Sequence, residues 1–138
     1  MVLFNSESHI ITVVDLAYYE NEKLIKVLVY DYDDYFDIKA VIDGIDFSAR
    51  GDDQFSAFQL FRDKLLEMGY GIKCNAARIN ALQSGMMRNL DVVYLVELGK
   101  QAKQEDVHGF WDYCEMDEYP YTDEQEAFRQ KWQDSLKE

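Results

Sequence analysis

The sequence is poor in cysteine, proline and glycine: its 138 residues include two cysteines, one proline and seven glycines. Cys74 and Cys114 allow at most one bridge, which excludes a disulfide scaffold, and neither belongs to a CxxC pair of the kind that metal and redox sites use. With so little proline and glycine, no flexible linker divides the chain. A chain of this length is therefore predicted to form a single domain over residues 1–138.

Long apolar runs are absent as well. No stretch approaches the roughly 18–20 apolar residues that a membrane-spanning helix requires. The first residues lack the basic segment and the small-residue cleavage site of a signal peptide. We therefore expect a cytoplasmic protein with reduced thiols, and its acidity argues against docking on anionic membrane surfaces.

Positive charge is scarce. The chain has 14 lysines and arginines against 27 aspartates and glutamates, which gives a formal net charge of −13. The few basic residues are scattered and phosphate would be repelled, so we expect no nucleic-acid partner. Hydrophobic residues nevertheless make up 48% of the chain, which is ample for a core and argues against disorder. The excess of carboxylates favours a basic partner.

The first fifty residues have the period-two alternation of strands. Apolar side chains alternate within residues 9–19 and 24–33, and the short polar segment between them predicts a hairpin. A third strand near residues 38–42 leads into Asp43-Gly44, which is typical of a type I′ turn. A fourth strand is expected directly after that turn.

The spacing of apolar residues changes to three and four after Gly51, which predicts a helix from Asp52 to Met68. Asp52 is expected to cap its first turn, and Gly69 is expected to end it in a left-handed conformation. A second helix is predicted from Asp123 to Leu136. Its expected start is a capping box formed by Thr122 and Gln125.

Shorter elements are expected between the two helices. The pattern predicts strands at residues 72–76 and 92–98, an irregular connection over 78–91 and a short helix within 104–111. The predicted fold class is α+β. An N-terminal antiparallel meander, extended by one or two later strands, carries the first helix on one face, and the C-terminal helix packs nearby.

Four carboxylates at the end of the second strand superficially resemble a calcium loop: Asp31, Asp33, Asp34 and Asp37. An EF-hand loop needs a glycine at its centre and a glutamate at its twelfth position. The twelfth position here is Ile42. We therefore expect a solvated acidic loop and no metal ion.

No catalytic motif is present either. His9 and His108 are the only histidines, and a Cys–His pair with Cys74 or Cys114 would require that they meet in space. Cys74 lies in a predicted strand, where a free cysteine is usually an inert small hydrophobe. Neither a GxGxxG nor a P-loop sequence occurs. We expect a protein that is not an enzyme and binds no cofactor.

Several short motifs follow one another in the second half of the chain. They are Arg50-Gly51-Asp52-Asp53, Cys74-Asn75-Ala76-Ala77-Arg78, Ser84-Gly85-Met86-Met87-Arg88, Leu98-Gly99-Lys100-Gln101-Ala102 and Trp132-Gln133-Asp134-Ser135-Leu136. In this order, over roughly residues 41–138, the chain resembles a family of small, mostly uncharacterised bacterial proteins found as immunity partners of secreted polymorphic toxins. The resemblance implies a protein that binds a cognate toxin and blocks it sterically.

Two clusters mix carboxylates with aromatic residues, and such clusters are suited to a basic partner. We predict that they bind the toxin. The first cluster is Asp31, Asp33, Asp34, Tyr35 and Asp37, and the second is Trp111, Asp112, Tyr113, Glu115, Asp117 and Glu118.

Three other interpretations remain open. In the first, the clustered charges serve solubility alone and the motif residues are scaffold, with Met86 filling the core and Arg78 or Arg88 forming internal ion pairs. The chain could instead be a small-ligand-binding or enzymatic α+β domain in which Arg78, Arg88 and Lys100 line an anion pocket. It could also be an adaptor, and either a monomer or a homodimer is compatible with the sequence.

Overall fold

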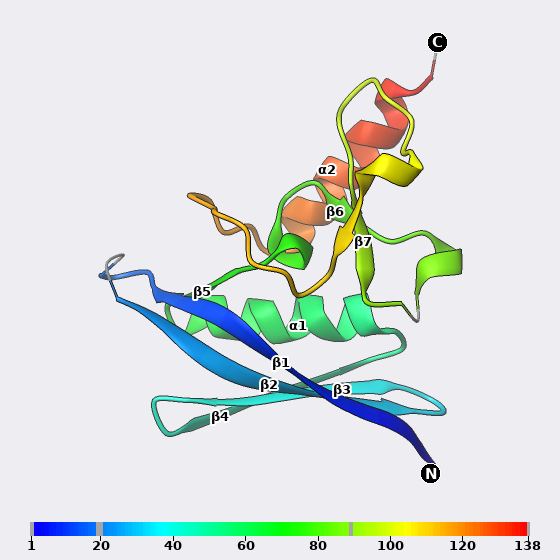
Figure 1. Ribbon diagram of the computed structural model, residues 1–138. Helices are drawn as coiled ribbons and strands as arrows, with labels where there is room; N and C mark the ends of the chain where they lie inside the picture. Colours follow the sequence, from blue (N-terminus) through cyan, green and yellow to red (C-terminus); the bar gives the residue numbers. More distant parts are fainter. Residues whose placement is uncertain (1, 19–20, 89, 138) are drawn as a thin grey trace.

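The computed structural model describes residues 2–18, 21–88 and 90–137. It has an α+β fold with two α-helices, a curled antiparallel sheet and a smaller second sheet (Figure 1). The elements are β1 (Leu3–Asp15), β2 (Glu22–Tyr32), β3 (Phe36–Ile42), β4 (Ile45–Gly51), α1 (Gln54–Glu67), β5 (Tyr70–Lys73), β6 (Ala81–Leu82), β7 (Val92–Leu95), β8 (Val107–Gly109) and α2 (Thr122–Ser135), with short 3₁₀ helices at Asn75–Ala77, Gly85–Met87 and Gln104–Asp106.

The larger sheet has the strand order β4-β3-β2-β1-β5, and all neighbours are antiparallel. The first four strands form the predicted meander. Strand β1 begins at Leu3, earlier than predicted, because its first residues pair with the far end of β2, where Leu3 lies opposite Tyr32. Strand β5 follows α1 and returns to the free edge of β1, with Val13 opposite Ile72.

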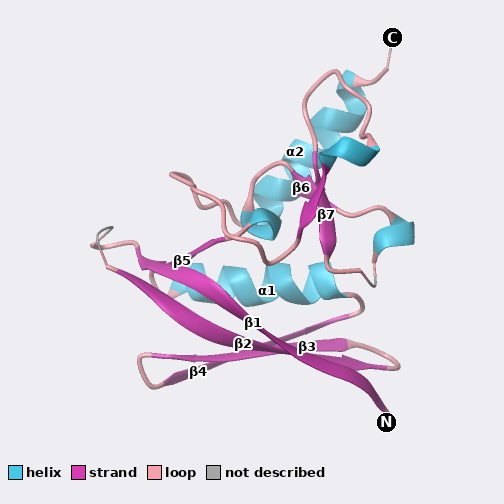
Figure 2. Ribbon diagram, in the orientation of Figure 1, coloured by secondary structure: helices cyan, strands magenta, loops and turns pink. Residues whose placement is uncertain are grey.

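Helix α1 lies between two layers (Figure 2). On one side it packs on the larger sheet, and on the other it is covered by the smaller sheet and α2. Its apolar residues Phe58, Phe61 and Leu65 are fully buried, as the helical spacing predicted. The second layer also buries polar residues of the same helix, among them Gln59 and Arg62.

The turns and caps confirm most of the local predictions. Asp43 and Gly44 both have positive φ, 51° and 78°, as a type I′ turn requires. Gly69 has φ 87°, and its N–H donates to the carbonyl of Leu66. The predicted N-cap was wrong by one residue, since it is Asp53 whose carboxylate accepts the Ser56 N–H at 2.8 Å.

The end of β4 lies very close to the first turn of α1. Gly51 still belongs to β4, opposite Phe36. A Cβ atom on Gly51 would lie 2.4 Å from the backbone nitrogen of Ala57, so only glycine lets the strand end pass this close to the helix.

The predictions between the helices were less accurate. Strand β5 ends at Lys73, and a 3₁₀ helix replaces the rest of the predicted 72–76 strand, while β7 ends at Leu95. The short helix predicted within 104–111 is confirmed as the 3₁₀ turn Gln104–Asp106. The next three residues form β8, which the sequence pattern did not predict, because β7 offers their backbone groups hydrogen-bond partners.

The capping box predicted for α2 was also wrong. The carboxylate of Glu124 accepts the Tyr121 N–H at 3.0 Å, so the reach back to the cap comes from Glu124 and the cap is Tyr121. Gln125 is free for another role because its side chain points into the protein, where it is 2% exposed. In the described part of the chain, no helix is long and apolar enough to cross a membrane.

Gln125 connects α2 to α1 and to the chain after β5. Its amide oxygen accepts hydrogen bonds from Arg62 Nη2 at 2.7 Å and from Gln59 Nε2 at 3.1 Å. Its amide nitrogen donates to the carbonyls of Ala76 and Arg78, at 3.0 and 2.7 Å. One side chain of α2 thus satisfies polar groups of two other segments, α1 and the chain after β5.

Replacing this side chain should destabilise the protein strongly. Gln125→Ala is expected to lower the free energy of unfolding by about 2–4 kcal/mol, because it leaves a buried guanidinium and two buried carbonyls without their partner. Urea unfolding of the variant measures the loss. The matched control is Gln130→Ala on the exposed side of α2, which should stay within about 0.5 kcal/mol of the parent. Equal stability of the two variants would contradict the role given to Gln125.

Candidate functional site

The first predicted cluster, at the turn between β2 and β3, is only partly on the surface. Asp33 and Asp34 are exposed. Asp37 is 7% exposed and accepts two hydrogen bonds from Arg50, each of 3.2 Å. The same guanidinium lies 3.8 Å from the ring centroid of Tyr35. The prediction that Asp37 meets a partner is therefore wrong, because its charge is already neutralised within the fold.

Asp31 also points away from the turn. It lines a small cavity of about 130 Å³ together with Glu7, Gln54 and Asp91. Burial raises the pKa of the Asp31 carboxyl above its ordinary value. Its placement follows from strand alternation, since it lies on the same face of β2 as the buried Val29.

In the second predicted cluster, Trp111 is a core residue. It is 6% exposed, stacks on His9 at 5.0 Å and packs edge-on against Phe58 at 5.4 Å. The prediction that Trp111 is an exposed anchor is wrong. The acidic residues that follow Trp111 suggested exposure, but the ring packs between His9 of the larger sheet and Phe58 of α1.

The rest of that cluster lies outside the core. Asp112 and Tyr113 are exposed, and the Tyr113 hydroxyl donates to Glu115 at 2.5 Å. Glu115 also accepts from Lys73 at 2.6 Å, and the same ammonium donates to Glu22 at 2.5 Å. These bonds lower the pKa of Glu115 and raise the pKa of Lys73.

Asp117 and Glu118 complete the cluster at the rim of a surface cleft of about 540 Å³. Among the described residues, neither has an ion-pair partner. We call this hollow the acidic cleft. Its walls carry the carboxylates of Glu97, Glu115, Asp117 and Glu118, the apolar residues Ile79, Val96, Leu98, Met116, Pro120 and Phe128, and Arg78 with Asn80.

A second hollow continues the acidic cleft. This hollow, of about 470 Å³, shares Asp117 and Glu118 with the cleft and adds the carboxylate of Glu124. The walls of the acidic cleft come from the segments after β5 and β7, from residues 115–120 and from α2. The sequence predicted the carboxylates of residues 115–118 as a binding surface, but not the apolar floor that other segments bring beneath them.

The three cations of the alternative anion pocket do not share a cavity. Arg78 lines the acidic cleft, whereas Arg88 lines a separate cavity of about 260 Å³ beside Arg129. Lys100 is exposed and pairs with Glu97 at 3.1 Å. This arrangement gives the anion-pocket interpretation no support.

Two of the motifs touch each other. The indole nitrogen of Trp132 donates to the carbonyl of Lys100 at 2.9 Å, and the N–H of Gly99 donates to the hydroxyl of Ser135 at 2.8 Å. These bonds hold the end of α2 against the turn after β7, as the scaffold interpretation expects. The scaffold interpretation also placed Met86 in the core, which is wrong. Met86 is 94% exposed, and its neighbour Met87 is buried instead.

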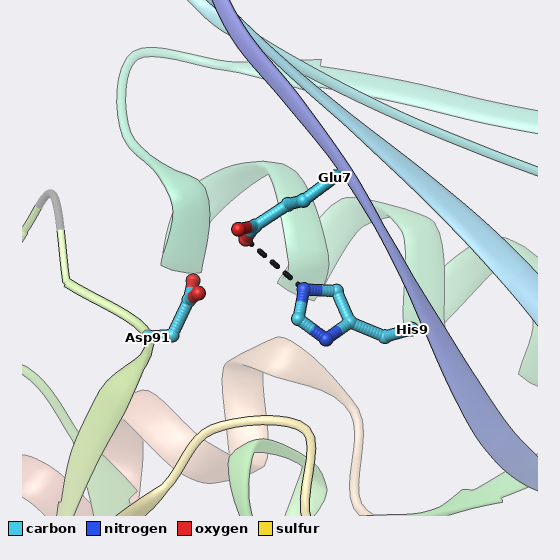
Figure 3. A group of neighbouring side chains, drawn as sticks. All are labelled: Glu7, His9 and Asp91. Atoms are coloured by element: carbon cyan, nitrogen blue, oxygen red, sulfur yellow. Dashed lines mark hydrogen bonds and ion pairs between the residues drawn. The ribbon is translucent and has the colours of Figure 1, made fainter.

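Three side chains could hold a metal ion: Glu7, His9 and Asp91. Their ligand atoms all lie within 4.8 Å of one another. Figure 3 shows Glu7 and His9 projecting from β1 toward Asp91, with a hydrogen bond of 3.0 Å between His9 Nε2 and a Glu7 carboxylate oxygen. The sequence reasoning missed this group, although Glu-x-His in a strand places both side chains on one face.

Comparison of the sequence with protein-family models and with curated proteins gave no match. The resemblance to immunity proteins stays a prediction.

The two thiols should differ in reactivity. Cys74 is fully buried, and burial raises the pKa of its thiol to about 12, while Cys114 is half-buried with a pKa raised less strongly. At about pH 8 a disulfide reagent should modify Cys114 slowly and Cys74 not at all, because the thiolate is the nucleophile. Both should react in urea. Equal rates in the native protein would contradict the burial of Cys74.

Asp31 should make stability depend on pH. A carboxyl whose pKa is raised by folding opposes folding when it is charged, and this cost disappears as the pH falls through the raised pKa. Asp31→Asn should therefore be more stable than the parent at about pH 7, and the difference should shrink toward about pH 4. Urea unfolding of the variant and the parent at each pH, with a chelator present, measures the difference in the free energy of unfolding. Asp33→Asn, on the exposed turn, is the control; a difference that does not change with pH would count against the burial of Asp31.

Proposed function

We propose that this chain is an inhibitor that binds a basic protein in its acidic cleft, and that the partner is a cognate bacterial toxin which it blocks sterically. One observation carries the proposal. The exposed carboxylates of Asp117 and Glu118, which have no ion-pair partner among the described residues, line a cleft together with apolar side chains. The toxin as partner rests on the resemblance to immunity proteins.

The cleft combines the two contacts that a basic segment needs. Carboxylates such as Asp117 and Glu118 can accept charge-assisted, bidentate hydrogen bonds from arginine. Ile79, Met116 and Phe128 offer apolar surface to the aliphatic stems of arginine and lysine, which bury readily while their charged ends reach the rim. A partner that inserts such side chains would meet both kinds of surface at once.

The overall charge supports the same kind of partner. A net charge of −13 on 138 residues attracts a basic protein at long range and speeds its association. Screening by salt should slow that association. Inhibition of this kind requires coverage of the toxin's working surface and no chemistry by the inhibitor.

The turn between β2 and β3 is the weaker candidate surface. Only Asp33 and Asp34 are exposed there, because Asp37 is buried against Arg50 and Asp31 lines the small cavity beside Glu7. A basic partner would find two charges at this turn. At the acidic cleft it would find several carboxylates around a hollow that its side chains can enter.

Charge reversal can separate the two surfaces. Asp117→Lys combined with Glu118→Lys should abolish host survival when the chain is co-expressed with the product of the adjacent upstream gene, and should weaken the complex in a pull-down titration by at least about a hundredfold. Asp33→Lys combined with Asp34→Lys changes the net charge equally. It should slow association and weaken the complex by less than about tenfold, because it alters only long-range attraction.

Two results would contradict the proposal. If the second double variant lost rescue while the first kept it, the binding surface would be the β2–β3 turn. If the neighbouring gene product were not toxic and formed no complex with the chain, the immunity function itself would be wrong.

A further inference from the structure

We propose that Glu7, His9 and Asp91 form a binding site for one divalent transition-metal ion, with Zn²⁺ as the best chemical match. The site is separate from the acidic cleft and goes beyond the function proposed above. It also departs from the expectation that the chain binds no metal, which considered only the carboxylates of residues 31–37.

The fold brings the three side chains together from the two sheets. Glu7 and His9 are two residues apart on β1, so they share its inner face. Asp91 directly precedes β7 in the smaller sheet, and its carbonyl accepts the Phe110 N–H at 2.9 Å, which fixes its backbone. An ion held by all three would connect the layers on either side of α1.

The distances suit a small ion. Zinc ligands lie about 2.0–2.2 Å from the metal, so two ligand atoms of a tetrahedral site are about 3.4 Å apart. His9 Nε2 and the Glu7 oxygen are 3.0 Å apart, and all three ligand atoms lie within 4.8 Å of one another. Small rotations of the side chains would place an ion between them.

A buried amide gives independent support. Gln54, the first residue of α1, is 2% exposed, and its amide nitrogen has no hydrogen-bond partner among the described residues. It lines the cavity of about 130 Å³ that Glu7 and Asp91 also line. An unpartnered buried donor is costly. A water molecule bound to the metal in this cavity would accept its hydrogen bond and fill the fourth position of a tetrahedral site.

Several carboxyl groups lie around this cavity. Glu7 and Asp91 both line it. Asp31 lines the same cavity and adds a third carboxyl. A divalent cation would offset this concentration of negative charge.

The ligand types indicate which ion binds. One imidazole nitrogen with two carboxylates suits zinc and similar transition metals, whereas calcium takes six to eight oxygen ligands. The His9 ring is also oriented in advance, because it stacks on Trp111 with 16° between the planes. This stacking limits the orientations that the His9 ring can adopt.

The test uses the full chain, freed of metal with a chelator. Titration with ZnCl₂ followed by calorimetry should give one ion per chain, with much weaker binding of MgCl₂ and CaCl₂. In NMR spectra, zinc should shift the ring signals of His9 and leave those of His108, which is exposed on β8 and serves as an internal control. Affinity should fall on acidification, since protons compete for the ligands.

Variants add a second readout. Glu7→Gln and Asp91→Asn should each weaken zinc binding by at least about tenfold, while Asp33→Asn and Asp117→Asn, on the surface, should not. The proposal would be overturned by the absence of zinc binding, by shifts confined to His108, or by equal affinities in all four variants. The NMR result on the parent chain decides the matter even if a variant fails to fold.

Discussion

The hydrogen bonds of the buried Arg62 guanidinium hold the two helices of the protein together. Arg62 lies in α1 with 1% of the residue exposed, and leaving such a charge without partners would cost several kcal/mol. Burial lowers the pKa of Arg62, which Asp63 counteracts through a hydrogen bond of 2.9 Å. The other partners, Thr122 and Gln125, come from α2. The C-terminal helix is thus held by the charge that it covers.

The position of α2 in turn determines the acidic cleft. Phe128 of α2 forms one wall, and residues 115–120, which lead into the helix, carry the carboxylates of the rim. The connection that contains these residues starts at Trp111, which packs against His9 on the larger sheet. The proposed cleft and the proposed metal site therefore lie at two ends of one connection. The sheet and α1 hold the first end, and Arg62 holds the second.

The carboxylates serve at least three different purposes. Asp37 is buried and pairs with Arg50, Asp43 pairs with Lys23 on an exposed turn, Glu7 and Asp31 line a small cavity, and Asp117 and Glu118 face solvent. Their charge in the sequence is the same. What differs is desolvation and the distance to a cation, and these decide whether a carboxylate is a structural partner, a possible ligand or a free surface charge.

The elements with local signals were predictable from the sequence alone. Alternation predicted the four-strand meander, Asp43-Gly44 predicted its tight turn, and apolar spacing predicted α1 and α2, because strand, turn and helix preferences act over a few residues. The sequence also identified the carboxylates of residues 115–118 as surface charge. The packing of the elements, in contrast, buries Trp111 and Asp37, turns Gln125 inward and brings Asp91 to Glu7 and His9. Each of these depends on contacts between residues far apart in the chain, whose free energy no local pattern records.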